Sequence, residues 1–375
     1  MNIPYHRHNL GREELAELAD TISGLFITTG SKTARFEEQF ARALEYQNAM
    51  AVGVTSATAA LHLALLALGV KPLDDVITTP LSFVATANAI LYTGARPVFV
   101  DVEKDTGNIN ADLISKAITK RTKAILPVHL YGQMCDMEQI RSIAKRHGLK
   151  VIEDSAHCIE GSRDGIRPGQ LGDAACFSFH AIKTLTSGEG GAIVVRDPGI
   201  ERILRQLRAH GIGQGALERR RKNVAKDMLR LGWKYNMSDI QASLLLPQIP
   251  LLKKRLKIRE HIAKRFGNAL LRGGIAMPKL LKGVKSSHSV FTIWVNPYER
   301  DAVMGRIRNA GVEALVVFQP IHLTSYYRKL GYGKGMFPAA ERIGASNVAL
   351  PIYPKLTANE INTITRAVLD AAAGS

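Results

Sequence analysis

The chain has 375 residues, of which 46% are hydrophobic and 22% are charged. This composition is typical of a globular protein and excludes a collagen, a coiled coil and a disordered chain. Its 50 lysines and arginines outnumber its 33 acidic residues, which gives a formal net charge of +17. Nucleic acid, an anionic membrane and an acidic small substrate must therefore all be considered as partners. At about 150 residues per domain, the length predicts two or three domains.

The cysteines and the N-terminus indicate the cellular compartment. Cys135, Cys158 and Cys176 are an odd number without a CxxC spacing, which argues against a disulfide framework or a cysteine metal site and fits a reducing cytoplasm. The first residues, MNIPYHRHNLGREEL, lack the apolar core of a signal peptide. The most apolar stretch, 59–70, is too short to span a bilayer. We therefore expect a soluble cytoplasmic protein with no metal and no membrane partner.

Strand-like and helical periodicities alternate through the first two-thirds of the chain. The predicted helices are 58–68, 82–92, 110–118 and 137–147. The predicted strands are 75–80, 95–101, 124–129, 150–154 and 174–179. Such alternation implies crossover connections and therefore an α/β fold, with a mostly parallel sheet and helices on both faces. Ligands of such sheets bind beyond the carboxyl ends of the strands, which makes Asp154, at the end of a strand, a candidate site residue.

The character of the sequence changes after Leu231. The elements expected beyond it are a loop and helix over 232–249, a long basic helix 253–271, a strand 290–295, a helix 300–310, a strand 311–317 and a helix 357–373. This is α+β organisation. We place a domain boundary near residue 250, with a large domain over 1–250 and a smaller C-terminal domain over 251–375.

The segment 153–191 contains the residue types that a covalent aldehyde cofactor needs. These are a lysine that forms a Schiff base, a carboxylate that keeps a pyridine nitrogen protonated, and hydroxyl and N–H groups at a helix N-terminus that bind a phosphate. Lys183 lies between a short apolar strand and a glycine-rich turn. Asp154 ends the preceding strand, Ser178 lies five residues before the lysine, and residues 56–58 begin a predicted helix.

Several short motifs follow one another in a specific order. They are SATAALHLAL (56–65), SFVATANAI (82–90), ARPVFVDV (95–102), VHLYGQ (128–133), EDSAH (153–157), FSFHAIK (177–183), SGEGG (187–191), KYNMSDIQA (234–242), HLTSYYRKLG (322–331) and LPIYPKLT (350–357). Together they resemble the DegT/DnrJ/EryC1/StrS family of sugar aminotransferases, over nearly the whole chain. The resemblance implies the aspartate-aminotransferase fold (PLP fold type I) and pyridoxal 5′-phosphate (PLP) as cofactor.

The resemblance also implies a role for each matching residue. Lys183 matches the Schiff-base lysine, and Asp154 matches the carboxylate partner of the pyridinium nitrogen. His157 matches the histidine or glutamine beneath the phenolic side of the ring, and Phe83 matches the aromatic side chain stacked on the cofactor.

Further matches concern the cofactor phosphate. Ser178 and Thr58 match hydroxyl ligands of the phosphate, and Ala57 matches a residue that binds it through the backbone. Asn236 matches an asparagine that reaches the phosphate of the neighbouring subunit's cofactor. The resemblance therefore implies a homodimer whose active sites are shared between subunits.

The implied reaction is ping-pong transamination from glutamate to a keto sugar carried by a nucleoside diphosphate, as in cell-surface polysaccharide biosynthesis. EDSAH and FSFHAIK most resemble the enzymes that aminate C4 of UDP-sugars on the way to 4-amino-4-deoxy-arabinose or the pseudaminic acid precursor, whereas amination at C3 of a dTDP-sugar stays open. Thr29 and His322 match segments that lie near substrate. The basic run 219–222, which begins at Arg219, is a candidate for attracting the diphosphate.

Other interpretations stay open. A lysine is usually solvated, an aspartate often caps a helix, a buried histidine is often structural and a phenylalanine usually belongs to a core. The basic runs 219–222 and 253–259 are typical of solvated surfaces. There is no zinc-finger or RNP motif and only 6% aromatic residues, so no nucleic acid partner is expected. The alternatives are a PLP-dependent sugar dehydratase, whose relatives have histidine in place of Lys183, and a non-catalytic regulator, which has no use for that lysine.

Overall fold

The computed structural model describes residues 2–213 and 227–374. Among these residues, a seven-stranded sheet has the strand order β1-β8-β7-β5-β4-β2-β3. Its strands are β1 (Met50–Val54), β2 (Asp75–Thr78), β3 (Arg96–Phe99), β4 (Thr122–Leu126), β5 (Lys150–Asp154), β7 (Ala174–Ser178) and β8 (Gly191–Val195). The pairs from β3 to β7 are parallel, whereas β8 runs antiparallel to β7 and β1. The predicted α/β fold with a mostly parallel sheet is confirmed.

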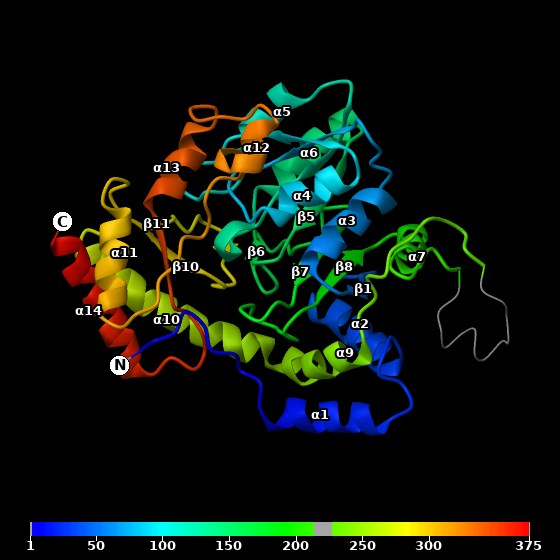
Figure 1. Ribbon diagram of the computed structural model, residues 1–375, viewed down its shortest axis with the longest axis horizontal. Helices are drawn as coiled ribbons and strands as arrows, with labels where there is room; N and C mark the ends of the chain where they lie inside the picture. The colour runs from blue at the N-terminus through cyan, green and yellow to red at the C-terminus, as the bar shows by residue number, and fades with distance from the viewer. Residues whose placement is uncertain (1, 214–226, 375) are drawn as a thin grey trace.

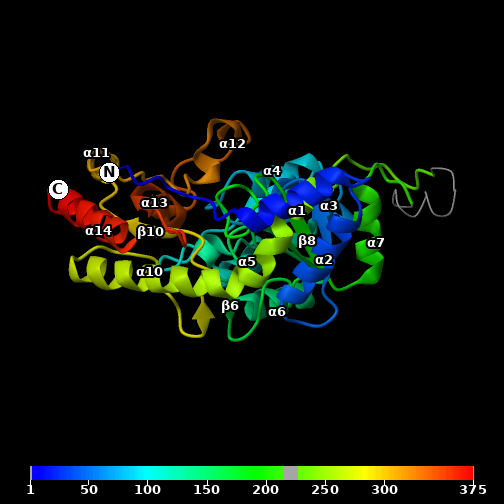
Figure 2. The same ribbon diagram turned by 90° about the horizontal axis from the view of Figure 1, so that it is seen from below.

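Helices cover both faces of this sheet (Figures 1 and 2). The helices on one face are α3 (Ala57–Ala67), α4 (Ala85–Tyr92) and α7 (Pro198–Leu207). Those on the other face are α2 (Ser31–Ala43), α5 (Ala111–Ala117), α6 (Met137–His147) and α9 (Asp239–Leu245). Alternate residues of β7 show this layering, because Ala174 and Cys176 pack with α3 whereas Ala175 and Phe177 pack with α2. Strands that are buried on both faces need continuous apolar runs, which explains the sequence AACF.

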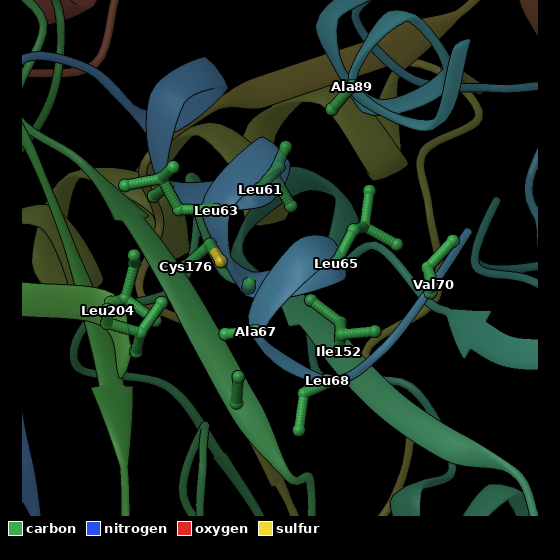
Figure 3. Packing of buried hydrophobic residues seen from close by; sticks show 14 of the residues in the cluster. Leu61, Leu63, Leu65, Ala67, Leu68, Val70, Ala89, Ile152, Cys176 and Leu204 are labelled. Atoms are coloured by element: carbon green, nitrogen blue, oxygen red, sulfur yellow. The ribbon is translucent and has the colours of Figure 1, made fainter. Parts of the chain in front are cut away.

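Helix α3 is the centre of the first core. Its sequence, ATAALHLALLA, is apolar on nearly all sides, because α3 packs against α4 and α7 as well as against the sheet. Figure 3 shows Leu61, Leu63 and Leu65 of this helix among Ile152 of β5 and Cys176 of β7. Each buried leucine contributes about 1.5–3 kcal/mol. This packing fixes the N-terminus of α3 over the edge of the sheet.

The last third of the chain forms a second core. Its long basic helix, predicted for 253–271, is present as α10 (Leu252–Arg272). Figures 1 and 2 both show α10 extending from α9, beside the sheet, to the end of the molecule that holds both termini. Ile3 near the N-terminus is buried in this second core and joins Val312 through a β-bridge. The domain boundary near residue 250 stays a prediction.

The remaining described elements belong to both halves of the molecule. They are α1 (Arg12–Ser23), β6 (Ser162–Arg163), β9 (Val284–Lys285), β10 (Phe291–Trp294), α11 (Arg300–Asn309), α12 (Ser325–Lys329), α13 (Pro338–Ser346), β11 (Asn347–Leu350), α14 (Ala358–Ala373) and the 3-10 helices η1 (Leu130–Gly132), η2 (Leu246–Leu251) and η3 (Ile321–Leu323). In the part of the chain that is described, no helix is both long enough and apolar enough to cross a membrane. The same residues contain no cluster of three or more histidine, cysteine or acidic side chains that could hold a metal ion.

The predicted strand 311–317 is wrong. Strand β10 pairs instead with β11, and the predicted segment makes only single bridges, at Val312 and at Leu315. The Asn347 side chain accepts a hydrogen bond from the Val317 amide at 2.7 Å and so takes the place of a ladder partner. The apolar run of this segment serves another purpose, because Leu315 to Phe318 line a cavity.

Candidate active site

A cavity of about 590 Å³ opens where the parallel strands of the sheet end. Asp154, the last residue of β5, and Ser178, the last residue of β7, both line it. Val128 and Ser82, which follow the ends of β4 and β2, line it as well. Because parallel strands have their carboxyl ends at one edge of the sheet, this edge gathers residues that are far apart in the chain.

Seven of the predicted site residues share this cavity: Ala57, Thr58, Phe83, Asp154, His157, Ser178 and Lys183. The opposite wall comes from the last third of the chain, through Ser289, Val290 and residues 315–318, and from Tyr5 near the N-terminus. The cavity therefore lies between the sheet and the C-terminal half of the molecule.

One end of the cavity is the N-terminus of helix α3. The Ser56 hydroxyl caps the helix by accepting a hydrogen bond from the Ala59 amide at 3.1 Å. The amides of Ala57 and Thr58 lie in the first turn, where N–H groups have no acceptor within the helix, and the helix dipole adds partial positive charge there. A phosphate group fits such an end.

Strand β8 packs against the loop at the N-terminus of α3. Its first residue, Gly191, pairs with Ser178 of β7. A Cβ atom at Gly191 would lie 2.5–2.7 Å from backbone atoms of Ser56 and Ala57, so the strand approaches the loop as closely as a glycine allows. This contact places Ser178 beside the N-terminus of α3.

The Asp154 carboxylate has two hydrogen-bond donors. Its Oδ2 accepts from the Thr86 hydroxyl at 2.7 Å and its Oδ1 accepts from the Ala156 amide at 3.1 Å. The Ser82 hydroxyl lies 2.9 Å from that of Thr86 and donates to it, because Thr86 gives its own proton to Asp154. Burial raises the pKa of Asp154, while Thr86, the Ala156 amide and the charge of Lys183 each oppose the rise.

Lys183 lies in a loop whose ends are joined by a hydrogen bond from the Phe179 amide to the Gly190 carbonyl at 2.9 Å. Gln248 holds this loop through Thr186, donating to its carbonyl at 2.7 Å and accepting from its amide at 3.3 Å. Burial lowers the pKa of Lys183 from 10.5 to about 8, although a nearby carboxylate opposes this effect. A lysine with such a pKa is partly neutral near neutral pH, which suits a nucleophile or a general base.

The His157 imidazole has a buried Nδ1 atom without a hydrogen-bond partner. The ring stacks on Phe318 with centroids 5.6 Å apart and an interplanar angle of 22°. Phe318 also contacts Phe83, whose ring centroid lies 5.7 Å away. Burial, followed by the charge of Lys183, lowers the pKa of His157 well below its usual range, so the imidazole is neutral at pH 7. The free ring nitrogen of a neutral imidazole can form one hydrogen bond with a bound molecule.

The remaining predicted residues lie elsewhere. Asn236 and Thr29 lie together outside the cavity lining, with the Asn236 side chain donating to the Thr29 hydroxyl at 2.6 Å. His322 is fully buried, and its Nε2 lies 3.0 Å from a carboxylate oxygen of Glu341. The structure does not bring these predicted residues to the cavity. Arg219 lies outside the described residues.

Among the cavity residues that were not predicted as site residues, Thr86 and Phe318 contact predicted ones and Ser82 contacts Thr86, whereas Gly191 packs beneath the phosphate end without lining the cavity. Ser82 and Thr86 stand four residues apart in SFVATANAI, a spacing that brings two hydroxyls together at the start of a helix and is a usable signal. Gly191 ends the motif SGEGG. Nothing in the sequence indicates that Phe318 reaches the cavity.

The family can be assigned from a comparison with known families. The model of the DegT/DnrJ/EryC1/StrS aminotransferase family matches residues 8–369. The chain belongs to this family. It is also similar to the spore coat polysaccharide biosynthesis protein SpsC of Bacillus subtilis, at 36% identity over 382 residues that cover 100% of this chain and 98% of SpsC.

Two solved structures illustrate the same similarity. Spr1654 from Streptococcus pneumoniae, in its PMP form, superposes with a TM-score of 0.94 at 29% identity over 100% of both chains. Helicobacter pylori PseC, an aminotransferase involved in the biosynthesis of pseudoaminic acid, superposes with a TM-score of 0.92 at 27% identity, again over 100% of both chains. The predicted fold type, cofactor and enzyme class are thereby confirmed: the protein is a PLP-dependent sugar aminotransferase.

Proposed function

We propose that this aminotransferase transfers the amino group of glutamate to the C4 keto group of a nucleotide-linked sugar, in two half-reactions that both use Lys183. The observation that carries the proposal is that Lys183, Asp154 and the N-terminus of α3 line one cavity. When bound, PLP supplies an aldehyde that captures amines and a ring that accepts an electron pair.

The residues of the cavity fit this cofactor. The first turn of α3, which contains Thr58, would hold the phosphate together with Ser178 beside it, and the Lys183 amine would hold the aldehyde. The Asp154 carboxylate would pair with the ring nitrogen. The unpartnered Nδ1 of His157 supports the fit, because a buried nitrogen of this kind costs free energy until a bound group pairs with it.

Each half-reaction needs a proton to be removed and returned. The Lys183 amine would do both, because a pKa of about 8 lets it exchange protons near neutral pH. The Asp154 carboxylate would stabilise positive charge at the ring nitrogen, and that charge would in turn oppose the rise that burial causes in the pKa of Asp154. Thr86 and Ser82 would keep the carboxylate ionised and oriented.

Amination at C4 and membership of a polysaccharide pathway rest on similarity. The motifs EDSAH and FSFHAIK, which resemble those of enzymes that aminate C4 of UDP-sugars, support the position. SpsC, a spore coat polysaccharide biosynthesis protein that is similar over its whole length, supports the pathway. The test is to incubate the enzyme with ¹⁵N-glutamate and either a UDP- or a dTDP-linked keto sugar and to locate the nitrogen by NMR. Nitrogen at C4 of a UDP-sugar supports the proposal, nitrogen at C3 of a dTDP-sugar establishes the alternative substrate, and no transfer to any sugar refutes both.

We also propose a homodimer in which Asn236 reaches the cofactor phosphate of the partner's site. Large apolar side chains that are exposed in the single chain support it: Leu25 is 89% exposed and Phe83, in the cavity wall, is 58% exposed. Asn236 lies apart from its own cavity, beside Thr29. Burial of these side chains between two subunits would remove their apolar surface from water.

Subunit complementation tests the shared site. Lys183→Ala and Asn236→Ala are each expected to be nearly inactive, because every site needs Lys183 from one subunit and Asn236 from the other. Mixed and refolded together, they form heterodimers in which one site is intact, so about a quarter of the wild-type activity returns. Mixing that restores no activity contradicts a shared site.

A further inference from the structure

Arg259 and Glu160 form a buried ion pair outside the cavity. Arg259 belongs to α10 and is 2% exposed. Its Nη2 donates to the Glu160 carboxylate at 2.6 Å, and its Nε donates to the Ser287 carbonyl at 3.0 Å. A buried ion pair adds little net stability, because the cost of desolvation offsets the attraction. The geometry that the pair imposes on its neighbours is therefore its more important property.

The pair contacts two loops that end in the cavity. Glu160 stands three residues after His157, and its other oxygen accepts a hydrogen bond from the Thr184 hydroxyl at 3.4 Å. Thr184 is adjacent to Lys183 in the chain. Ser287, which Arg259 holds, donates its hydroxyl to the His157 carbonyl at 2.5 Å. One ion pair thus touches the loop of Lys183 directly and the backbone of His157 through a serine.

The contact at His157 is close-packed. The Ser289 hydroxyl donates to the same His157 carbonyl at 2.6 Å, and the Ser287 amide donates to the Gly132 carbonyl at 2.9 Å. A Cβ atom at Gly132 would collide with the Ser287 hydroxyl and lie 3.1 Å from the His157 carbonyl oxygen. A shift of Ser287 therefore moves His157 with it.

We propose that Glu160, fixed by Arg259, is a positioning residue for the transfer reaction: it sets the place of the Lys183 amine relative to the His157 imidazole. Glu160 does not line the cavity and acts through Thr184 and Ser287. Through this pair, helix α10 of the C-terminal half holds both sides of the site. The inference rests on the roles that the proposed function gives to Lys183 and His157.

Glu160→Gln tests it, because the change keeps the size of the side chain and removes its charge. We expect the melting temperature to fall. The visible band of the lysine-bound cofactor should titrate with a midpoint pH shifted by about half a unit or more. With glutamate, kcat should fall about tenfold with little change in KM. Asp75→Asn is the matched control. Asp75 is a buried carboxylate held by Arg96 at 2.9 Å and 3.0 Å, at the start of β2 and away from the cavity.

The control separates positioning from stability. Asp75→Asn is expected to lower the melting temperature and to leave the midpoint of the band unchanged. If Glu160→Gln fails to fold, Thr184→Val replaces it, because this variant loses only the hydroxyl that contacts Glu160, and it too must shift the midpoint. A wild-type midpoint in whichever variant folds overturns the inference, whereas a wild-type protein that forms no visible band with PLP refutes the proposed function itself.

Discussion

Thr86→Val removes the hydroxyl that donates to Asp154 and preserves the shape of the side chain. The lost hydrogen bond is 2.7 Å long and buried, and hydrogen bonds to charged groups contribute about 1.5–3 kcal/mol. At about 1.4 kcal/mol per pKa unit, the pKa of Asp154, which burial already raises, should rise by a further one to two units or so. The carboxylate then stabilises a protonated ring nitrogen less well, and the half-reaction with glutamate should slow about 10- to 100-fold.

The assay is stopped-flow absorption of the PLP-loaded enzyme after mixing with glutamate, repeated across pH. Asp154 must be ionised to act, so activity is lost as pH falls through its pKa, and a raised pKa moves this acid limb to higher pH in the variant. Thr78→Val is the matched control, because the Thr78 hydroxyl is equally buried and donates to the Leu126 carbonyl at 2.8 Å rather than to the site. Equal rates and equal acid limbs in the two variants would refute the role given to Thr86.

Two further predictions concern the phosphate end and the lysine. Gly191→Ala should weaken PLP binding to the apo-protein about tenfold or more in a fluorescence titration, because the added Cβ would press on Ser56 and Ala57. The control variant Gly305→Ala, whose Cβ meets open space, should bind PLP normally. Burial lowers the pKa of Lys183 from 10.5 to about 8, so between these values the unfolded apo-protein binds more protons than the folded one and stability rises with pH. Lys183→Met should remove this dependence of stability on pH and stabilise the apo-protein by about 3 kcal/mol at pH 7. Thermal melting from pH 7 to 10 measures both effects. If the variant and the wild type show the same dependence of stability on pH, the amine is solvated.

The sheet and most of the cavity could be predicted from the sequence because their signals are local. Strand β7 begins with the continuous apolar run AACF, and α10 has a helical period over its whole length. Asp154 and Ser178 end such strands, and the topology of a parallel sheet brings strand ends together without further information. The motifs around Lys183 predict that it is the Schiff-base lysine, and the structure places it in the cavity with Asp154 and Ser178.

What the sequence could not show depends on packing between distant segments. The contact of Thr86 with Asp154 joins residues 68 apart, and it exists only because α4 is seated over the end of β5. His322 belongs to the motif HLTSYYRKLG, whose segment lies near substrate by resemblance, yet its imidazole is buried against Glu341. The segment 311–317 has the alternation of a strand, but the Asn347 side chain takes one of its ladder positions and the segment lines the cavity instead.

The most direct test of Lys183 as the lysine that binds PLP, and of glutamate as the amino donor, is the visible absorption spectrum of the purified protein loaded with PLP, before and after glutamate. We expect a visible band that glutamate abolishes and 2-oxoglutarate restores. We also expect Lys183→Ala to bind PLP without forming this band, since the amine that holds the aldehyde is gone. A wild-type protein without the band, or with a band that does not respond to glutamate, would contradict the assignment of Lys183 and of the amino donor.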